Sequence, residues 1–140
     1  MNSDPRPMPE GIKLGQVAQI ALDCTDLERA TSFYEGCLGL ERVGHVPGLL
    51  AFFDAGGVSL YLQQSDEVRP NSCLYFAVEG RPGAIDATYD ALKQRGVSVG
   101  EAPHCIAKGW QGHDVWLAFF EDPFGNKLAL RSDVPVGDER

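Results

Sequence analysis

The segment at residues 104–116 carries the densest group of side chains in this sequence that could do chemistry. It contains two histidines, two tryptophans, a lysine and an aspartate. Histidine transfers protons and binds metal ions near neutral pH, and two indoles beside a loop often form a wall for a flat ligand. We therefore expect Trp116 to line a ligand site, with His104 and His113 at the mouth of that site.

A second group of candidate residues comes from four short segments in which apolar and polar residues alternate, a pattern typical of β-strands. These segments cover residues 17–23, 57–63, 73–79 and 127–131. One face of each predicted strand is aliphatic and should lie beneath a helix. The opposite faces, mixed polar and aromatic, suit a cup that holds a ligand. The residues of these opposite faces are Gln19, Ala21, Ser59, Tyr61, Gln63, Cys73, Tyr75, Ala77, Lys127, Ala129 and Arg131.

A solvated sheet face is the alternative interpretation of this second group, but Tyr61 and Tyr75 argue against full exposure. Arg131 is a permanent cation within the group, so it favours a ligand with a carboxylate or an electron-rich oxygen. The two groups together give one predicted ligand-binding set. Its members are Gln19, Tyr61, Gln63, Cys73, Tyr75, His104, His113, Trp116 and Arg131.

Two helices and further strands must hold these faces in position. Thr25-x-x-Glu28 is a capping box, which predicts the start of a helix that ends at Gly39. A second helix is expected to begin near Pro82 and to end at Gly96. The apolar residues at helical spacing are Leu27, Ala30, Tyr34, Cys37 and Leu38 in the first helix and Ile85, Tyr89 and Leu92 in the second. The remaining predicted strands cover residues 40–46, 49–54, 97–105 and 115–121.

The sequence repeats itself, which fixes the order of these elements. Residues 50–54 read Leu-Ala-Phe-Phe-Asp, and residues 117–121 read Leu-Ala-Phe-Phe-Glu. An internal similarity of this kind indicates two copies of one supersecondary unit. Both halves have the order βαβββ, at about residues 13–67 and 70–132.

The 140 residues are enough for one domain with a real core. We expect a single domain at residues 13–132 that contains both halves. Residues 1–12 should form a flexible arm, and residues 133–140 a polar tail. The four cysteines of the chain form no CxxC pair, so we expect them to be reduced thiols.

Through four short sequence motifs in this arrangement, the chain resembles the vicinal oxygen chelate superfamily. That family includes glyoxalase I, extradiol dioxygenases, methylmalonyl-CoA epimerase and bleomycin-resistance proteins. The motifs are Asp26-Leu-Glu-Arg-Ala30, Phe33-Tyr34, Cys37-Leu-Gly-Leu40 and Glu121-Asp-Pro-Phe-Gly-Asn126. The resemblance implies an α+β fold of two tandem βαβββ modules (glyoxalase/bleomycin-resistance-like), whose sheets form a ligand cup.

In family members with a metal, the resemblance implies four ligands from the first and last strands of the two modules. Those ligands are typically His or Gln, Glu, His and Glu, and the matching positions here are Gln19, Tyr61, Cys73 and Ala129. An amide, a phenol, a thiol and a methyl group offer little negative charge to a divalent ion at pH 7. We therefore expect that the metal site of the family is lost and that no cofactor is bound. A separate metal site is a further possibility, and its ligands would be His104, His113, Asp114 and Glu121.

Three functions remain open, and whether the protein is an enzyme is one of the open points. The first is a metal-free module that binds a small organic molecule, similar to antibiotic-binding resistance proteins. The second is a metal-dependent glyoxalase or lyase, epimerase or dioxygenase-type enzyme. The third is a metal-free enzyme that uses Tyr61, Cys73 or a histidine as acid or base. Tyr61 and Ala129 stand where the family has carboxylates, which favours the first function, the metal-free binding module.

Charge and hydropathy limit the partners. A net charge of −8 repels phosphate backbones, so we expect no nucleic-acid partner. No apolar run reaches the length of a membrane span, and the first residues lack the apolar core of an export signal. We therefore expect a cytoplasmic protein without a membrane partner. Sheet edges need covering, and the family resemblance implies pairing, so a homodimer is expected.

Overall fold

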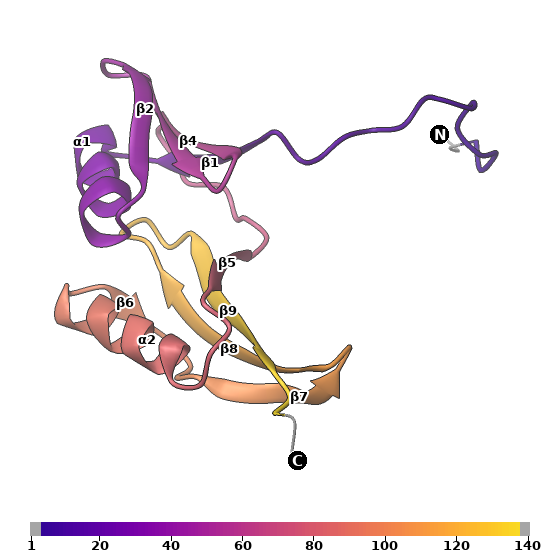
Figure 1. The fold of residues 1–140 in the computed structure, drawn as a ribbon. Helices are drawn as coiled ribbons and strands as arrows, with labels where there is room; N and C mark the ends of the chain where they lie inside the picture. The colour runs from indigo at the N-terminus through magenta and orange to yellow at the C-terminus, as the bar shows by residue number, and fades with distance from the viewer. Residues whose placement is uncertain (1–3, 138–140) are drawn as a thin grey trace.

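The computed structural model describes residues 4–137, and its first half folds as a four-stranded sheet with helical turns on one face (Figure 1). The strands follow the order β1-β4-β3-β2, with β1 parallel to β4 and the other pairs antiparallel. We refer to this half as module 1 and to its sheet as sheet A. Its elements are β1 (Gln19–Cys24), α1 (Leu27–Thr31), η1 (Ser32–Cys37), β2 (Glu41–Val46), β3 (Leu50–Ala55) and β4 (Val58–Gln64).

The second half, module 2, repeats the plan as sheet B. Its strands follow the order β5-β9-β8-β6, β7 also pairs with β8, and β5 is parallel to β9. The prediction of an α+β fold with two tandem βαβββ modules is confirmed. The elements of module 2 are β5 (Leu74–Val78), α2 (Ala84–Gln94), β6 (Ser98–Val99), β7 (His104–Trp110), β8 (His113–Glu121) and β9 (Lys127–Pro135).

The predicted strand at residues 97–105 is wrong as one continuous element, because β6 and β7 are separate. Both still run along β8, and two hydrogen bonds bridge the gap between them: Gly100 N–H donates to Phe119 O, and Phe119 N–H donates to Glu101 O. Pro103 lies in the gap and has no N–H to donate, which explains the break in a ladder. The two pieces therefore act as one interrupted edge strand.

The first helix begins one residue later than its sequence suggests and changes type midway. The predicted cap at Thr25 is wrong: Asp26 is the N-cap, and its carboxylate accepts from Arg29 N–H at 3.1 Å. After α1 the chain continues as a π-helix, in which Leu38 N–H donates to Phe33 O at 3.0 Å. The wider turn of a π-helix rotates the side chains that follow it. Here Tyr34 and its neighbour Phe33 are both buried.

Helix α2 agrees with its predicted apolar stripe. Ile85, Tyr89 and Leu92 are buried, and the Tyr89 hydroxyl donates to Gly100 O at 2.8 Å. Gly83 is the N-cap with a positive φ of 82°, so the helix starts after Pro82 rather than at it.

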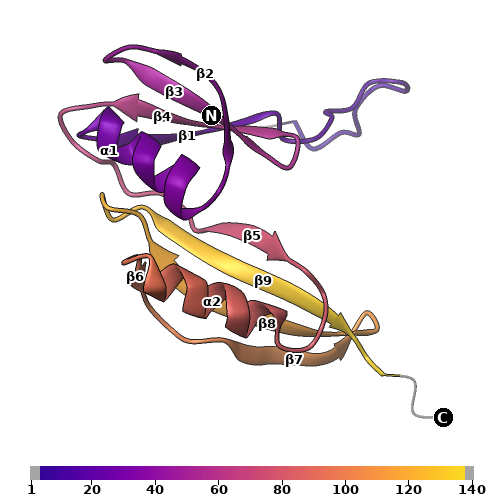
Figure 2. The ribbon, with the colours of Figure 1, turned by 60° about the vertical axis from the view of Figure 1, so that its left-hand side comes forward.

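Both helices lie on the same side of the molecule, each covering one sheet (Figure 2). One cluster of buried residues runs through both modules beneath them. The aliphatic strand faces supply much of it, as the alternation predicted. Its fully buried members include Leu60 and Leu62 from β4 and Leu128 from β9.

A buried hydrogen-bond network joins the two modules. The Tyr34 hydroxyl of module 1 donates to Asp122 Oδ2 of module 2 at 2.7 Å. The same carboxylate accepts from the backbone N–H groups of Phe124 and Asn126 and from Asn126 Nδ2. Asn126 Nδ2 also donates to the Asp23 carbonyl on β1. Burial, together with the Asp122 charge, raises the pKa of Tyr34, so the phenol stays protonated and remains a donor.

The two ends of the described chain differ in structure. The residues before β1 run away from sheet A (Figure 1), whereas β9 continues to Pro135 and so enters the segment expected as a polar tail. Residues 1–3 of the expected arm and 138–140 of the expected tail lie outside the described residues. Within residues 4–137, no helix has the length and apolar character needed to cross a membrane.

The junction network predicts the effect of Tyr34→Phe. The change removes one donor from a buried carboxylate, so the free energy of unfolding should fall by about 1–3 kcal/mol. Urea denaturation at pH 7 measures this loss. Tyr61→Phe is the matched control, because the Tyr61 hydroxyl makes no hydrogen bond within residues 4–137, and it should change stability by less than about 0.5 kcal/mol. Equal stability of Tyr34→Phe and the native chain would contradict the assignment.

Candidate functional site

Each sheet has a face opposite its helix, here called the helix-free face, and on sheet A it brings several predicted residues together. The register places Ala21 beside Tyr61 and Tyr61 beside Phe52, with the two aromatic rings 5.4 Å apart. Gln19 lies diagonally from Tyr61, because it pairs with Ser59. The residues of β1 and β4 on this face are Gln19, Ala21, Asp23, Ser59, Tyr61 and Gln63.

Asp23 organises one end of this face, and the sequence analysis missed it. Its side chain is only 4% exposed, and the Arg69 guanidinium donates to both carboxylate oxygens at 2.7 and 2.9 Å. Gln63 Nε2 donates to the same carboxylate at 2.7 Å. Arg69 holds the pKa of Asp23 far below its usual range. The amide of Gln63 is therefore already engaged within the protein, whereas the prediction had it contact a ligand.

An aromatic cluster occupies the helix-free face of sheet B. Ala129 pairs with Tyr75 on one side and with Phe119 on the other, and the two rings lie 6.3 Å apart edge to face. The His104 ring lies 6.4 Å from Phe119. Ala129 is fully buried and Tyr75 is 53% exposed, so the rings present an accessible aromatic surface above a small residue.

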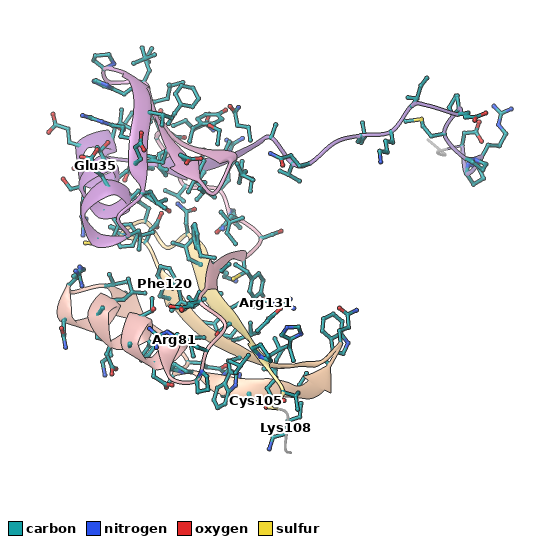
Figure 3. The ribbon with its side chains drawn as sticks, in the orientation of Figure 1. Glu35, Arg81, Cys105, Lys108, Phe120 and Arg131 are labelled. Carbon is teal, nitrogen blue, oxygen red and sulfur yellow. The ribbon has the colours of Figure 1, made fainter. Side chains whose placement is uncertain are left out.

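Arg131 adds a cation to this aromatic surface. It neighbours Ala77 and Leu117 in the sheet and projects away from the helix side, where Phe120 lies (Figure 3). Its guanidinium is 5.8 Å from the centre of the Trp110 ring and donates to Asp133 at 2.8 and 3.2 Å. A guanidinium has five N–H donors, so donors remain for a ligand after the contact with Asp133.

The tryptophan on this face is Trp110 and not the predicted Trp116. Trp116 pairs with Ser132, shares the helix side with Phe120, and lines a cavity of about 290 Å³ against the start of α2. Trp110 is 51% exposed beside Arg131. Two register shifts in β7 precede Trp110, so simple alternation along the sequence does not reveal its side of the sheet.

Cys73 borders a cavity of about 320 Å³ at the start of β5, which Phe119, Glu121 and Lys127 also line. Burial raises the pKa of the Cys73 thiol, so it is a neutral thiol at pH 7. The two predicted histidines are held by backbone carbonyls: His104 Nδ1 lies 2.9 Å from Ala102 O, and His113 Nδ1 lies 3.0 Å from Gln111 O.

The residues at the metal-ligand positions implied by the family resemblance do not fit a divalent ion. Ala129 contributes a methyl group, the Tyr61 ring packs on Phe52, and Cys73 is a neutral thiol. Across residues 4–137, no three His, Cys, Asp or Glu side chains converge as a metal site would require.

The alternative metal site at His104, His113, Asp114 and Glu121 is not assembled either. His113 and Glu121 are the two ends of β8, which places them roughly 26 Å apart along the strand. Asp114 lies on the helix side with Trp116, and its carboxylate accepts from Gly109 N–H at 2.9 Å. The predicted set is therefore spread over two strands, with His104 on β7 and the other three residues on both faces of β8.

These arrangements define the chemistry that the helix-free faces present. Flat aromatic rings, an arginine with free donors and a neutral thiol line the helix-free faces. Such surfaces stack on planar groups and hydrogen-bond to carboxylates.

Comparison with known proteins gives one family. A family model described as "Glyoxalase/Bleomycin resistance protein/Dioxygenase superfamily" matches residues 16–130. No curated protein matches this chain by sequence.

Solved structures show the same fold. A glyoxalase/bleomycin resistance protein/dioxygenase from Nocardioides is 22% identical, with a TM-score of 0.69 and coverage of 94% of this chain and 91% of that chain. The corresponding protein from Alicyclobacillus acidocaldarius is 24% identical, with a TM-score of 0.64 and coverage of 84% and 91%. A lactoylglutathione lyase from Agrobacterium tumefaciens is 23% identical, with a TM-score of 0.65 and coverage of 86% and 95%.

The Asp23–Arg69 pair predicts a pH-dependent loss in Asp23→Asn. The pKa of Asp23 is lower in the folded chain than in the unfolded chain, so the ionised carboxylate stabilises the fold above about pH 4. That stabilisation is lost as the pH falls toward the native pKa. Asp23→Asn should therefore melt at a lower temperature than the native chain at pH 7, and the difference should shrink at pH 3.

Circular dichroism melting at both pH values measures this difference. Asp66→Asn is the control, because Asp66 is exposed, and it should leave the melting temperature unchanged. A melting difference for Asp23→Asn that is the same at pH 7 and pH 3 would contradict the ion-pair explanation.

Proposed function

This chain belongs to the Glyoxalase/Bleomycin resistance protein/Dioxygenase superfamily, and from that membership we propose that it binds a small organic molecule on the helix-free faces without a metal ion. The observation that carries the proposal is the surface formed by Tyr75, Phe119, Trp110 and Arg131 on sheet B. Aromatic rings beside a cation with free donors select a planar molecule that carries a carboxylate or an electron-rich oxygen.

The residues of sheet A complete the proposed site. Tyr61 and Phe52 supply a second aromatic pair, and Gln19 offers an exposed amide at the start of β1. The sequence prediction of a cup formed by both sheets is retained as part of this proposal. In it, the two aromatic pairs contact the flat part of the ligand, and Arg131 contacts its polar end.

The absence of metal chemistry is the second part of the proposal. It is supported by the donor set at Gln19, Tyr61, Cys73 and Ala129, which lacks both carboxylates. Removing a dication from water without anionic ligands is very costly. The competing function, a metal-dependent lyase, epimerase or dioxygenase, requires ligands from elsewhere in the chain.

We also propose that the chain is a homodimer. The described residues expose large apolar side chains, among them Val43 and Leu49 in module 1 and Ile106 in module 2, each more than half exposed. Apolar exposure of this kind marks interaction surfaces, and twofold pairing is the commonest arrangement.

Ligand recognition predicts different effects for two probes. Isothermal titration with 1-naphthoate and with the neutral 1-naphthamide should show tighter binding of the carboxylate. Arg131→Ala should weaken naphthoate binding by about tenfold and leave naphthamide nearly unchanged, because only the carboxylate uses the guanidinium. Tyr61→Ala should weaken both by roughly 1–3 kcal/mol if the ring contacts the flat part.

Arg81→Ala is the matched control, because Arg81 is an exposed arginine on the helix side of module 2 (Figure 3). It should bind both probes like the native chain. Binding that is indifferent to Arg131 and to Tyr61 would refute the site.

Metal independence predicts that the purified protein carries no stoichiometric metal and keeps its melting temperature in EDTA. Elemental analysis and thermal melting measure these two properties. The triple variant Tyr61→Glu, Cys73→His, Ala129→Glu should gain zinc affinity if the four positions converge. One equivalent of bound metal in the native protein, with activity lost in chelator, would instead support the enzyme.

A further inference from the structure

Strand β9 carries two cations on its helix-free face, one on each side of Ala129. Lys127 and Arg131 belong to the same face because side chains alternate along a strand. Four residues of extended chain separate their Cα atoms by about 13 Å. Leu128 and Leu130, which lie between them on the opposite face, are buried in the core. The helix-free face of β9 therefore has a positive charge at each end and a small residue in the middle.

An aromatic pair lies between these two charges. Ala129 pairs with Tyr75 on β5 and with Phe119 on β8, and the two rings are 6.3 Å apart. Two residues further along β9, Arg131 pairs with Leu117. A flat molecule that stacks on the rings along β9 therefore directs one end toward Arg131 and the other toward Lys127.

The surface is hollowed at the Lys127 end. A cavity of about 320 Å³ lies there, and Lys127, Phe119 and Glu121 line it. Its volume is within the range of small-molecule pockets, about 300–1,000 Å³. Small residues from three parts of module 2 leave this room, and they are Cys73, Ser98 and Gly100.

The Lys127 ammonium group is available to a ligand. Lys127 is exposed, and none of the ion pairs within residues 4–137 includes its side chain. Glu121 is its neighbour across the strands, but it does not engage the ammonium group as an ion pair. An acidic group in the cavity therefore meets a free cation beside one carboxylate.

Arg131 keeps hydrogen-bond donors at the other end of the surface. Its Nε and Nη2 atoms donate to the Asp133 carboxylate at 2.8 and 3.2 Å. No hydrogen bond in the described part of the chain uses Nη1, and the side chain is 41% exposed. The Trp110 ring, 5.8 Å from the guanidinium, borders this end. A second acidic group therefore finds unused N–H donors there.

We propose that the helix-free face of sheet B binds a planar dianion with an acidic group at each end, one held by Arg131 and the other by Lys127. This inference rests on the proposed function and specifies its ligand class, because that function by itself requires only one polar end at Arg131. Carboxylates and similar oxyanions are the partners that a guanidinium and an ammonium group bind most strongly. The rings above Ala129 bind the flat body, and the spacing along β9 sets the distance between the acids.

The charge of the whole chain does not favour a dianion. The net charge is −8, so the long-range field of the protein repels a ligand with two negative charges more than a ligand with one. Salt at about 0.15 M screens most of that repulsion. Tighter binding of a dianion therefore reports close contacts with two cations rather than a general attraction.

Isothermal titration at about 0.15 M salt with three probes tests the proposal. Naphthalene-2,6-dicarboxylate carries its acids at opposite ends of the rings. Naphthalene-1,2-dicarboxylate has the same charge with adjacent acids, and 2-naphthoate has one acid. The native chain should bind the 2,6-isomer about tenfold tighter than either of the others, because only this isomer reaches both cations.

Variants assign the two ends. Lys127→Met should weaken binding of the 2,6-isomer about tenfold and leave 2-naphthoate nearly unchanged, because its single acid uses the guanidinium. Arg131→Ala should weaken both probes. Glu121→Gln removes the carboxylate beside Lys127 and should strengthen binding of the 2,6-isomer. Lys93→Met is the matched control, because Lys93 is an exposed lysine of α2 beside Tyr89, and it should bind all three probes like the native chain.

The results separate this inference from the proposed function. Failure of all three probes to bind, or binding that is indifferent to Arg131, overturns both. Binding of 2-naphthoate that depends on Arg131, with a 2,6-isomer that binds no tighter or does not respond to Lys127→Met, overturns the dianion alone. Equal affinity for the two dicarboxylates, reduced equally in Lys127→Met, also overturns it, because the protein then recognises charge and not the distance between the acids.

Discussion

The buried Asp122 carboxylate is the interaction on which the arrangement of the two modules depends. It accepts hydrogen bonds from Tyr34 in module 1 and from Phe124 and Asn126 in its own turn. A buried charge is tolerated only when its lone pairs are satisfied, so the turn and the helix must meet in this one way. Tyr34 lies in the π-helix, where its side chain is buried in the core.

This junction also fixes which surfaces are left for function. Both helices cover one side of the sheets, and Asn126 ties the turn to the end of β1. The helix-free faces, bordered by Asp23 and its partner Arg69 on sheet A, remain open. These faces carry aromatic rings, amides and guanidinium groups, and the carboxylates of Asp23 and Asp133 are paired with Arg69 and Arg131. This chemistry supports the stacking and anion contact that we propose.

The same scaffold leaves strand edges that the helices cannot cover. A βαβββ module has one helix, and that helix packs on a face of the sheet and not on its ends. Beside the β1 edge of module 1 lies the buried Asn126 Oδ1, which has no hydrogen-bond partner within residues 4–137.

The sequence by itself determined the elements and their faces, because apolar periodicity is a local property that burial enforces. Alternation placed Leu60 and Leu128 in the core and Tyr75 and Arg131 on the other face. The tertiary structure decided the cap at Asp26 and the break between β6 and β7. It also decided that Trp110 rather than Trp116 lies on the helix-free face, since bulges and turns reset the alternation. The tertiary structure likewise decided the Tyr34–Asp122 contact across 88 residues, because no local pattern records which distant donor will satisfy a buried carboxylate.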